Sequence, residues 1–206
     1  MNRYVIDGGK KLYGGEYSLV PDQIEAGTYM AAAAAAGGSV KICHVIPDHL
    51  ECISSVLRDM GAEVKAGNDY VQVTSSGHLH GTDIVTEPYP GFPTDMQPQI
   101  GAVMCGAEGE STIHESVWSE RFRYLEELKL MGAACEVDGQ HAVIHGKSPL
   151  KGAVMTACDL RAGAAMVIAA LAAEGTSEIH NIPLIERGYQ DIAGKLAELG
   201  ADIHAE

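Results

Sequence analysis

Basic residues, aromatic residues and long apolar runs are all scarce in this sequence of 206 residues, and each scarcity excludes a class of protein. Lys and Arg number 14 against 28 Asp and Glu, so the net charge is −14. Because polyanions are bound by clustered basic side chains, we expect no nucleic acid and no membrane surface as a partner. The longest apolar run, residues 30–36, is too short to cross a bilayer, and residues 1–7 lack an apolar signal core. Neither export nor anchoring is therefore expected.

The cysteines also follow no pattern that indicates disulfides or a metal site. They are five in number and form no C-x-x-C motif, so one would be left over in any disulfide scheme: Cys43, Cys52, Cys105, Cys135 and Cys158. We interpret them as reduced thiols without chemistry in a cytoplasmic protein. His78 and His80 supply only two potential ligands, which favours a solvated turn over a metal site.

What the sequence does have is an internal repeat. Three segments begin at Asp22, Asp95 and Asp159, each at a plausible helix N-cap. Each continues with an Ala-, Gly- and Met-rich helix, then a glycine and a short strand, then an amphipathic helix that ends at a Gly-Ala pair. The predicted first helices are residues 24–36, 96–107 and 160–173, and the strands that follow them are residues 38–42, 109–113 and 175–179.

The repeat predicts an α/β (α+β) fold built from three β-α-β-α-β-β units around a pseudo-threefold axis. We expect one domain, residues 1–206, with repeats at about 21–78, 79–149 and 150–206. The third unit lacks its last strand. We therefore predict that residues 1–20 form a strand, a loop and a strand that close the domain, with Tyr4–Ile6 pairing with Asp202–His204.

Parallel strands within each unit would bring distant loops to one rim, where open α/β sheets bind their ligands. The second helices are expected to open with acid-base pairs: Asp48-His49, Glu120-Arg121 and Glu186-Arg187. The expected rim residues are Asp22, Asp95, Asp159, Arg161, His49, Arg121 and Arg187. Carboxylates suit proton abstraction and arginines suit phosphate or carboxylate ligands, so the pattern favours an anionic substrate.

A structural interpretation of the same residues stays open. Capping alone would select an Asp at three helix starts, and a Glu-Arg pair can be a solvated ion pair. Asp95 stands apart because its loop, residues 88–94, holds three prolines and a glycine, which is more stiffening than a cap requires.

Four segments carry a resemblance to a known family: residues 21–29, residues 90–97, Asp159-Leu160-Arg161-Ala162 and Arg187-Gly188-Tyr189. In this order the chain resembles the C-terminal half of the UDP-N-acetylglucosamine 1-carboxyvinyltransferases, which belong to the enolpyruvate transferases. The resemblance implies an inside-out α/β barrel domain. It also implies transfer of enolpyruvyl from phosphoenolpyruvate to the 3-hydroxyl of UDP-N-acetylglucosamine in peptidoglycan biosynthesis, with no metal or organic cofactor.

The resemblance also implies roles for individual residues. Asp95 is similar to the carboxylate that contacts the sugar hydroxyl and acts as the base, and Arg187 to the arginine that binds phosphoenolpyruvate. Asp159 and Arg161 would support domain closure, and Arg121 resembles a rim arginine. Val117 and Trp118 would line the sugar pocket.

The family's Lys-Asn motif and its Cys-bearing loop, the target of fosfomycin, have no counterpart in this sequence. We therefore expect the chain to be inactive alone, and to self-associate through its exposed interdomain face. Two alternatives stay open. One is a fragment of a shikimate-phosphate enolpyruvyl transferase, and the other is a stand-alone UDP-sugar-binding or assembly module.

Overall fold

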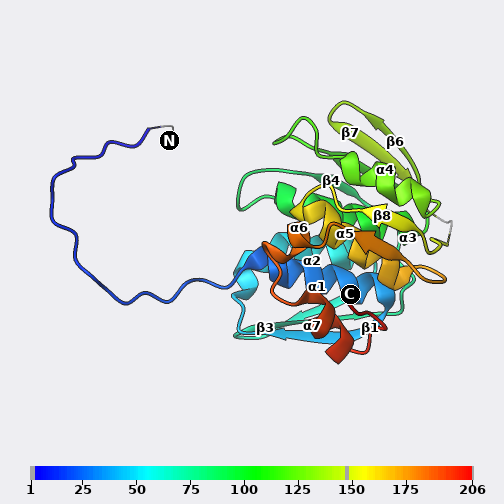
Figure 1. Ribbon diagram of the computed structural model, residues 1–206, viewed down its shortest axis with the longest axis horizontal. Helices are drawn as coiled ribbons and strands as arrows, with labels where there is room; N and C mark the ends of the chain where they lie inside the picture. The colour runs from blue at the N-terminus through cyan, green and yellow to red at the C-terminus, as the bar shows by residue number, and fades with distance from the viewer. Residues whose placement is uncertain (1–2, 147–148, 206) are drawn as a thin grey trace.

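The computed structural model describes residues 3–146 and 149–205, which fold into a rounded α/β body with an extended N-terminal segment (Figure 1). The ends of the predicted domain, Met1 and Glu206, lie outside the described residues. The helices are α1 (Gln23–Ala36), η1 (Pro47–Leu50), α2 (Glu51–Asp59), η2 (Thr94–Met96), α3 (Gln97–Gly106), α4 (Arg123–Leu130), α5 (Leu160–Ala172), α6 (Pro183–Glu186) and α7 (Ile192–Glu198). The strands are β1 (Gly38–Cys43), β2 (Glu63–Ala66), β3 (Tyr70–Ser75), β4 (Asp83–Val85), β5 (Glu110–His114), β6 (Ala134–Asp138), β7 (His141–His145), β8 (Val154–Thr156) and β9 (Glu178–His180).

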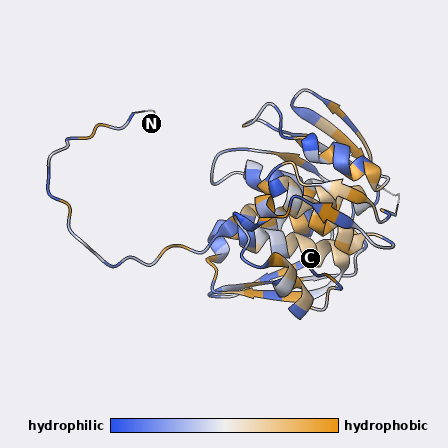
Figure 2. Ribbon diagram, in the orientation of Figure 1, coloured by the Kyte–Doolittle hydropathy of each residue, from blue (hydrophilic) through white to orange (hydrophobic). Residues whose placement is uncertain are grey.

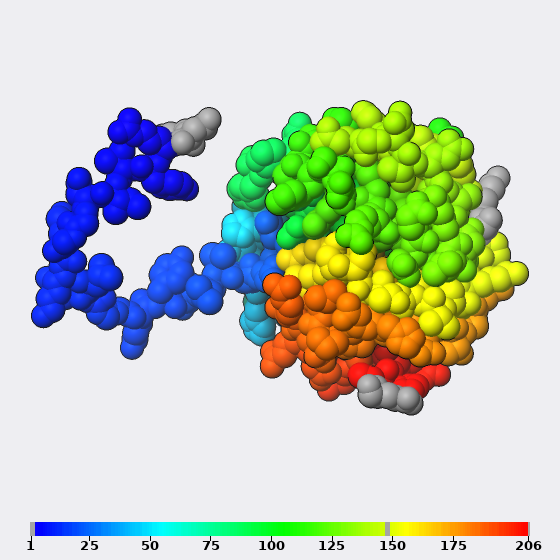
Figure 3. Space-filling view, turned by 45° about the horizontal axis from the view of Figure 1, so that its top comes forward, coloured from blue at the N-terminus to red at the C-terminus, as the bar shows by residue number. Residues whose placement is uncertain are grey.

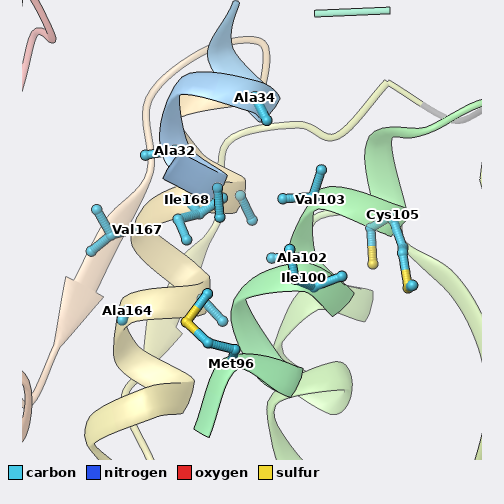
Figure 4. Packing of buried hydrophobic residues seen from close by; sticks show 14 of the residues in the cluster. Ala32, Ala34, Met96, Ile100, Ala102, Val103, Cys105, Ala164, Val167 and Ile168 are labelled. Carbon is cyan, nitrogen blue, oxygen red and sulfur yellow. The ribbon is translucent and has the colours of Figure 1, made fainter. Parts of the chain in front are cut away.

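Three apolar helices, α1, α3 and α5, pack against one another at the centre of the body. They appear pale to orange in Figure 2, whereas polar residues gather on the outer elements. Small side chains permit close packing around α1, because a Cβ added at Gly27 would lie 2.8 Å from Met96 Sδ in the short helix η2 that precedes α3. Figure 4 shows side chains of the three helices meeting there, among them Ala34, Ile100, Val103 and Ile168. The three predicted first helices are confirmed to within one residue at each end.

Small sheets lie outside this helical centre and turn alternate residues toward it. The first sheet has the antiparallel order β1-β3-β2, and Val71 and Val73 of β3 are fully buried. The second has the order β4-β5-β7-β6, in which β4 runs parallel to β5. The third pairs β8 with β9 in parallel. From β4 to β7 the chain follows the order β-α-β-α-β-β.

The predicted closing strand is wrong. Residues 3–20 form no strand, and they extend away from the rounded body (Figures 1 and 3). Tyr4 and Ile6 are 96% and 85% exposed, and residues 202–204 are likewise outside any strand. β-prone side chains form a strand only where neighbours pack against them, and glycine pairs at residues 8–9 and 14–15 provide no side chain for packing.

Among the described residues, no helix has both the length and the apolar character needed to cross a bilayer.

Candidate active site

The parallel strand pairs bring loops from distant parts of the chain to one rim. Asp95 lies beyond the C-terminal end of β4, and Arg121 lies beyond that of its parallel neighbour β5. Asp159 and Arg161 follow β8, and Arg187 follows β9, which is parallel to β8. All five residues line one open cavity of about 310 Å³. The C-terminal ends of parallel strands are the usual ligand site of α/β sheets.

Asp95 differs from the other aspartates that begin the repeats. The carboxylates of Asp22 and Asp159 cap α1 and α5, each accepting hydrogen bonds from two backbone N–H groups. Asp95 instead lies within the short helix η2, where its Oδ1 accepts a hydrogen bond from Arg121 Nη2 at 2.7 Å and its Oδ2 lies 3.2 Å from Arg161 Nη2. The capping interpretation therefore holds for Asp22 and Asp159. The Asp95 carboxylate is held by charge at the cavity.

The cavity carries an excess of positive charge in an acidic chain. Its three arginines and two aspartates leave a formal charge of one positive unit, against −14 for the whole sequence. The side chains of Arg121 and Arg161 are only 17% and 14% exposed, whereas that of Asp95 is 42% exposed. Partly desolvated guanidinium groups interact with anions more strongly than exposed ones. The cavity is thus suited to an anion that lies beside an accessible carboxylate.

A buried polar network holds Arg161 from the interior side of the cavity. The Tyr189 hydroxyl is 3.2 Å from Arg161 Nη1, 2.8 Å from Thr28 Oγ1 and 3.2 Å from Gln99 Nε2. It therefore ties α1, α3 and α5 together directly beneath the cavity. Burial lowers the pKa of the Arg161 guanidinium, but Tyr189 and Asp95 outweigh this effect and raise the pKa above its usual value. Arg161 remains a fixed positive charge.

Val117 and Trp118 lie on the loop after β5 but outside the set of residues that line the cavity. The two residues are 44% and 57% exposed. The backbone N–H groups of both residues donate to the buried carboxylate of Glu115, at 2.9 Å and 3.1 Å. Their predicted contact with a sugar stays a prediction.

The first repeat does not contribute to this cavity. Asp22 and His49 line a separate depression with essentially no internal volume, about 0 Å³. The prediction that Glu186-Arg187 opens a helix is also wrong. Glu186 ends the short helix α6, and the next helix begins at Ile192, capped by Asp191. The Asp191 side chain binds the Gly194 N–H, a capping signal that the sequence interpretation overlooked.

Several site residues were missed from the sequence. Leu160, Leu184 and Cys158 also line the cavity, and Tyr189 and Glu115 support it from the interior. Burial, followed by the neighbouring Asp159 carboxylate, raises the pKa of the Cys158 thiol, which disfavours a reactive thiolate. A signal for Glu115 was present, since it directly follows a strand that ends at the rim.

The family model described as EPSP synthase (3-phosphoshikimate 1-carboxyvinyltransferase) matches residues 1–196. The chain belongs to this family. Within it, the chain is 54% identical over 201 residues to UDP-N-acetylglucosamine 1-carboxyvinyltransferase 2 of Clostridium acetobutylicum, covering 98% of this chain and 48% of that protein. It is 45% identical over 202 residues to UDP-N-acetylglucosamine 1-carboxyvinyltransferase of Thermotoga maritima, again covering 98% of this chain and 48% of the relative. The chain thus spans about half the length of the curated relatives it matches.

Solved structures of this family share the fold. The enolpyruvyl transferase NikO from Streptomyces tendae superposes with a TM-score of 0.82 at 32% identity, covering 90% of this chain and 44% of that one. EPSP synthase from Acinetobacter baumannii gives a TM-score of 0.75 at 22% identity, covering 96% of this chain and 50% of that one, a likeness in fold alone.

Proposed function

We propose that this chain forms one half of the active site of a UDP-N-acetylglucosamine 1-carboxyvinyltransferase. The observation that carries the proposal is the cavity in which one accessible carboxylate, Asp95, lies among three arginines. The identity of about half the residues to enzymes of that name, across nearly all of this chain, supports the choice of substrates. The half-length match supports a second half that completes the site.

The proposed reaction joins the 3-hydroxyl oxygen of the sugar to C2 of phosphoenolpyruvate and breaks the bond between C2 and the phosphate oxygen. Asp95 accepts the proton of the attacking hydroxyl, as a positioned carboxylate base. Its neighbours Arg121 and Arg161 hold it in place and offset its charge. Arg187, which is exposed at the cavity, pairs with the carboxylate and phosphate of phosphoenolpyruvate.

The remaining predicted residues take supporting roles in this proposal. Asp159 caps α5 and so fixes the start of the helix that carries Arg161. Val117 and Trp118 form the wall beside the sugar. The proposed arrangement of the whole domain is the inside-out α/β barrel of this enzyme type, with its three units around the buried helices α1, α3 and α5. We place the activity in the cytoplasm, where the free thiols stay reduced.

The test is complementation with a separately produced N-terminal half of a relative. Phosphate release from phosphoenolpyruvate is measured with UDP-N-acetylglucosamine or with shikimate 3-phosphate, for the chain alone and for the mixture. We expect release only from the mixture and only with the UDP-sugar. Release by the chain alone would contradict the half-site, and release with shikimate 3-phosphate would reassign the substrate. Sugar binding that complementation never converts into turnover would identify a binding module.

The face around the cavity is also where we expect two copies to associate when the other half is absent. Sedimentation velocity measures the oligomeric state, and we expect a dimer from the chain alone that is lost when that half is added.

A further inference from the structure

One fully buried carboxylate, Glu115 at the end of β5, joins three separate segments near the proposed base. Its Oε1 accepts hydrogen bonds from Thr86 Oγ1 at 2.8 Å, from Val117 N at 2.9 Å and from Trp118 N at 3.1 Å. Its Oε2 accepts a hydrogen bond from Thr94 Oγ1 at 2.9 Å. Glu115 itself has 0% exposure.

These partners are neutral hydroxyl and backbone N–H groups. A buried carboxylate bound by neutral donors is retained at a cost in desolvation, and its donors would be left unpaired if it were removed. The carboxylate therefore needs its donors to offset its desolvation, and the loops that supply these donors are in turn held in place by the carboxylate.

The two oxygens serve different loops. Oε2 holds Thr94, the residue directly before Asp95 in η2. Oε1 binds the backbone N–H groups of Val117 and Trp118, which follow the neighbouring strand β5. Thr86, at the end of β4, strengthens the junction because its Oγ1 also accepts a hydrogen bond from Ser116 N at 2.8 Å.

We propose that Glu115 is a positioning residue that fixes the Asp95 loop and the Val117–Trp118 loop relative to each other, so that both loops contact one ligand. This inference rests on the proposed function for its catalytic meaning, since Asp95 is there the base and the second loop the sugar wall. The mechanical part of the inference, that Glu115 keeps the two loops ordered, does not depend on the proposed function.

Trp118 provides a reporter for the mechanical part, because it is the single tryptophan of the sequence and is 57% exposed. Acrylamide quenching of its fluorescence is measured in the chain alone, without ligand. Glu115→Asp keeps the charge but withdraws both oxygens by one methylene, and we expect the quenching constant to rise about twofold. Glu115→Gln keeps the size and an acceptor oxygen, and Glu110→Gln alters an exposed carboxylate of the same strand. Both should match the wild-type chain.

The Thr94 pair of variants tests the catalytic part in the complemented enzyme. Thr94→Val keeps the shape but removes the donor to Oε2, and Thr94→Ser restores a hydroxyl. We expect Thr94→Val to lower kcat about tenfold with KM changed less than threefold, because a displaced base impairs the chemical step. Thr94→Ser should recover most of the loss, and quenching of Trp118 should stay unchanged in both variants.

The outcomes separate the two proposals. Unchanged quenching of Trp118 in Glu115→Asp would show that Glu115 does not join the two loops, whether or not the complemented enzyme turns over. Full kcat in Thr94→Val would overturn the positioning role, and this result also decides the matter if Glu115→Asp fails to fold. A complemented wild-type chain without turnover would refute the proposed function, while the quenching experiment still decides whether Glu115 orders the loops.

Discussion

Replacing Tyr189 with Phe removes one oxygen atom that joins three central helices to the cavity. The side chain is fully buried, and its hydroxyl contacts Thr28 Oγ1, Gln99 Nε2 and Arg161 Nη1. The loss is partly compensated. Thr28 still donates to the Ile24 carbonyl at 2.8 Å and still accepts from Gln99 at 3.2 Å. Only the bond to Arg161 is charge-assisted, so we expect the free energy of unfolding to fall by about 2 kcal/mol.

The measurement is urea unfolding of the wild-type chain, Tyr189→Phe and the control Tyr13→Phe, whose side chain is 87% exposed. For a domain of this size the loss corresponds to a fall in Tm of about 4–8 °C. The control should change the free energy by less than about 0.5 kcal/mol. A loss below about 0.5 kcal/mol in Tyr189→Phe would refute the network. A loss above about 4 kcal/mol would show that the neighbouring groups do not compensate.

Two further predictions concern the core. Gly101→Ala places a Cβ against the hydroxyl oxygen of buried Tyr124 and should cost about 2–3 kcal/mol. Gly106→Ala, at the end of the same helix and with open space around it, should be neutral or stabilising by up to about 1 kcal/mol, and thermal unfolding of the two variants compares them. Burial raises the pKa of Cys105 to about 12, so at pH 8 iodoacetamide should label exposed Cys43 and leave Cys105 unmodified until urea is added. Mass spectrometry identifies the labelled cysteine, and rapid labelling of Cys105 in the folded chain would contradict its burial.

The helical centre was predictable because its signal is local. Each of the first helices is rich in small apolar residues over more than two turns, and Asp22 and Asp159 cap two of them at the expected positions. Strand β1 was also predicted to within one residue, since the apolar Val40 and Ile42 alternate with polar residues. Local periodicity and capping chemistry are enough for such elements.

The errors arose where tertiary packing decides the outcome. Tyr4–Ile6 has strand-forming residues, but only a neighbouring edge could make it a strand, and the sequence does not reveal edges. Glu186-Arg187 resembles the pairs in the other repeats, yet Asp191 begins the helix. Five of the expected rim residues line one cavity, but the side chains that support them were not predicted. Tyr189 acts through Thr28, Gln99 and Arg161, which are remote in the chain, and no spacing rule predicts such contacts.

The central claim is that the Asp95 carboxylate performs chemistry at the arginine-lined cavity, whereas the equivalent aspartate of the first repeat is a cap. The most direct test is kcat of the complemented enzyme for Asp95→Asn and Asp22→Asn. Asparagine retains the size of both side chains and the single Asp22 oxygen that accepts from Ile24 N and Glu25 N, but it replaces one of the two acceptor oxygens of Asp95 and is not a base. We expect Asp95→Asn to lower kcat by at least about 100-fold and Asp22→Asn to leave it within about twofold. Equal turnover in the two variants would contradict the account.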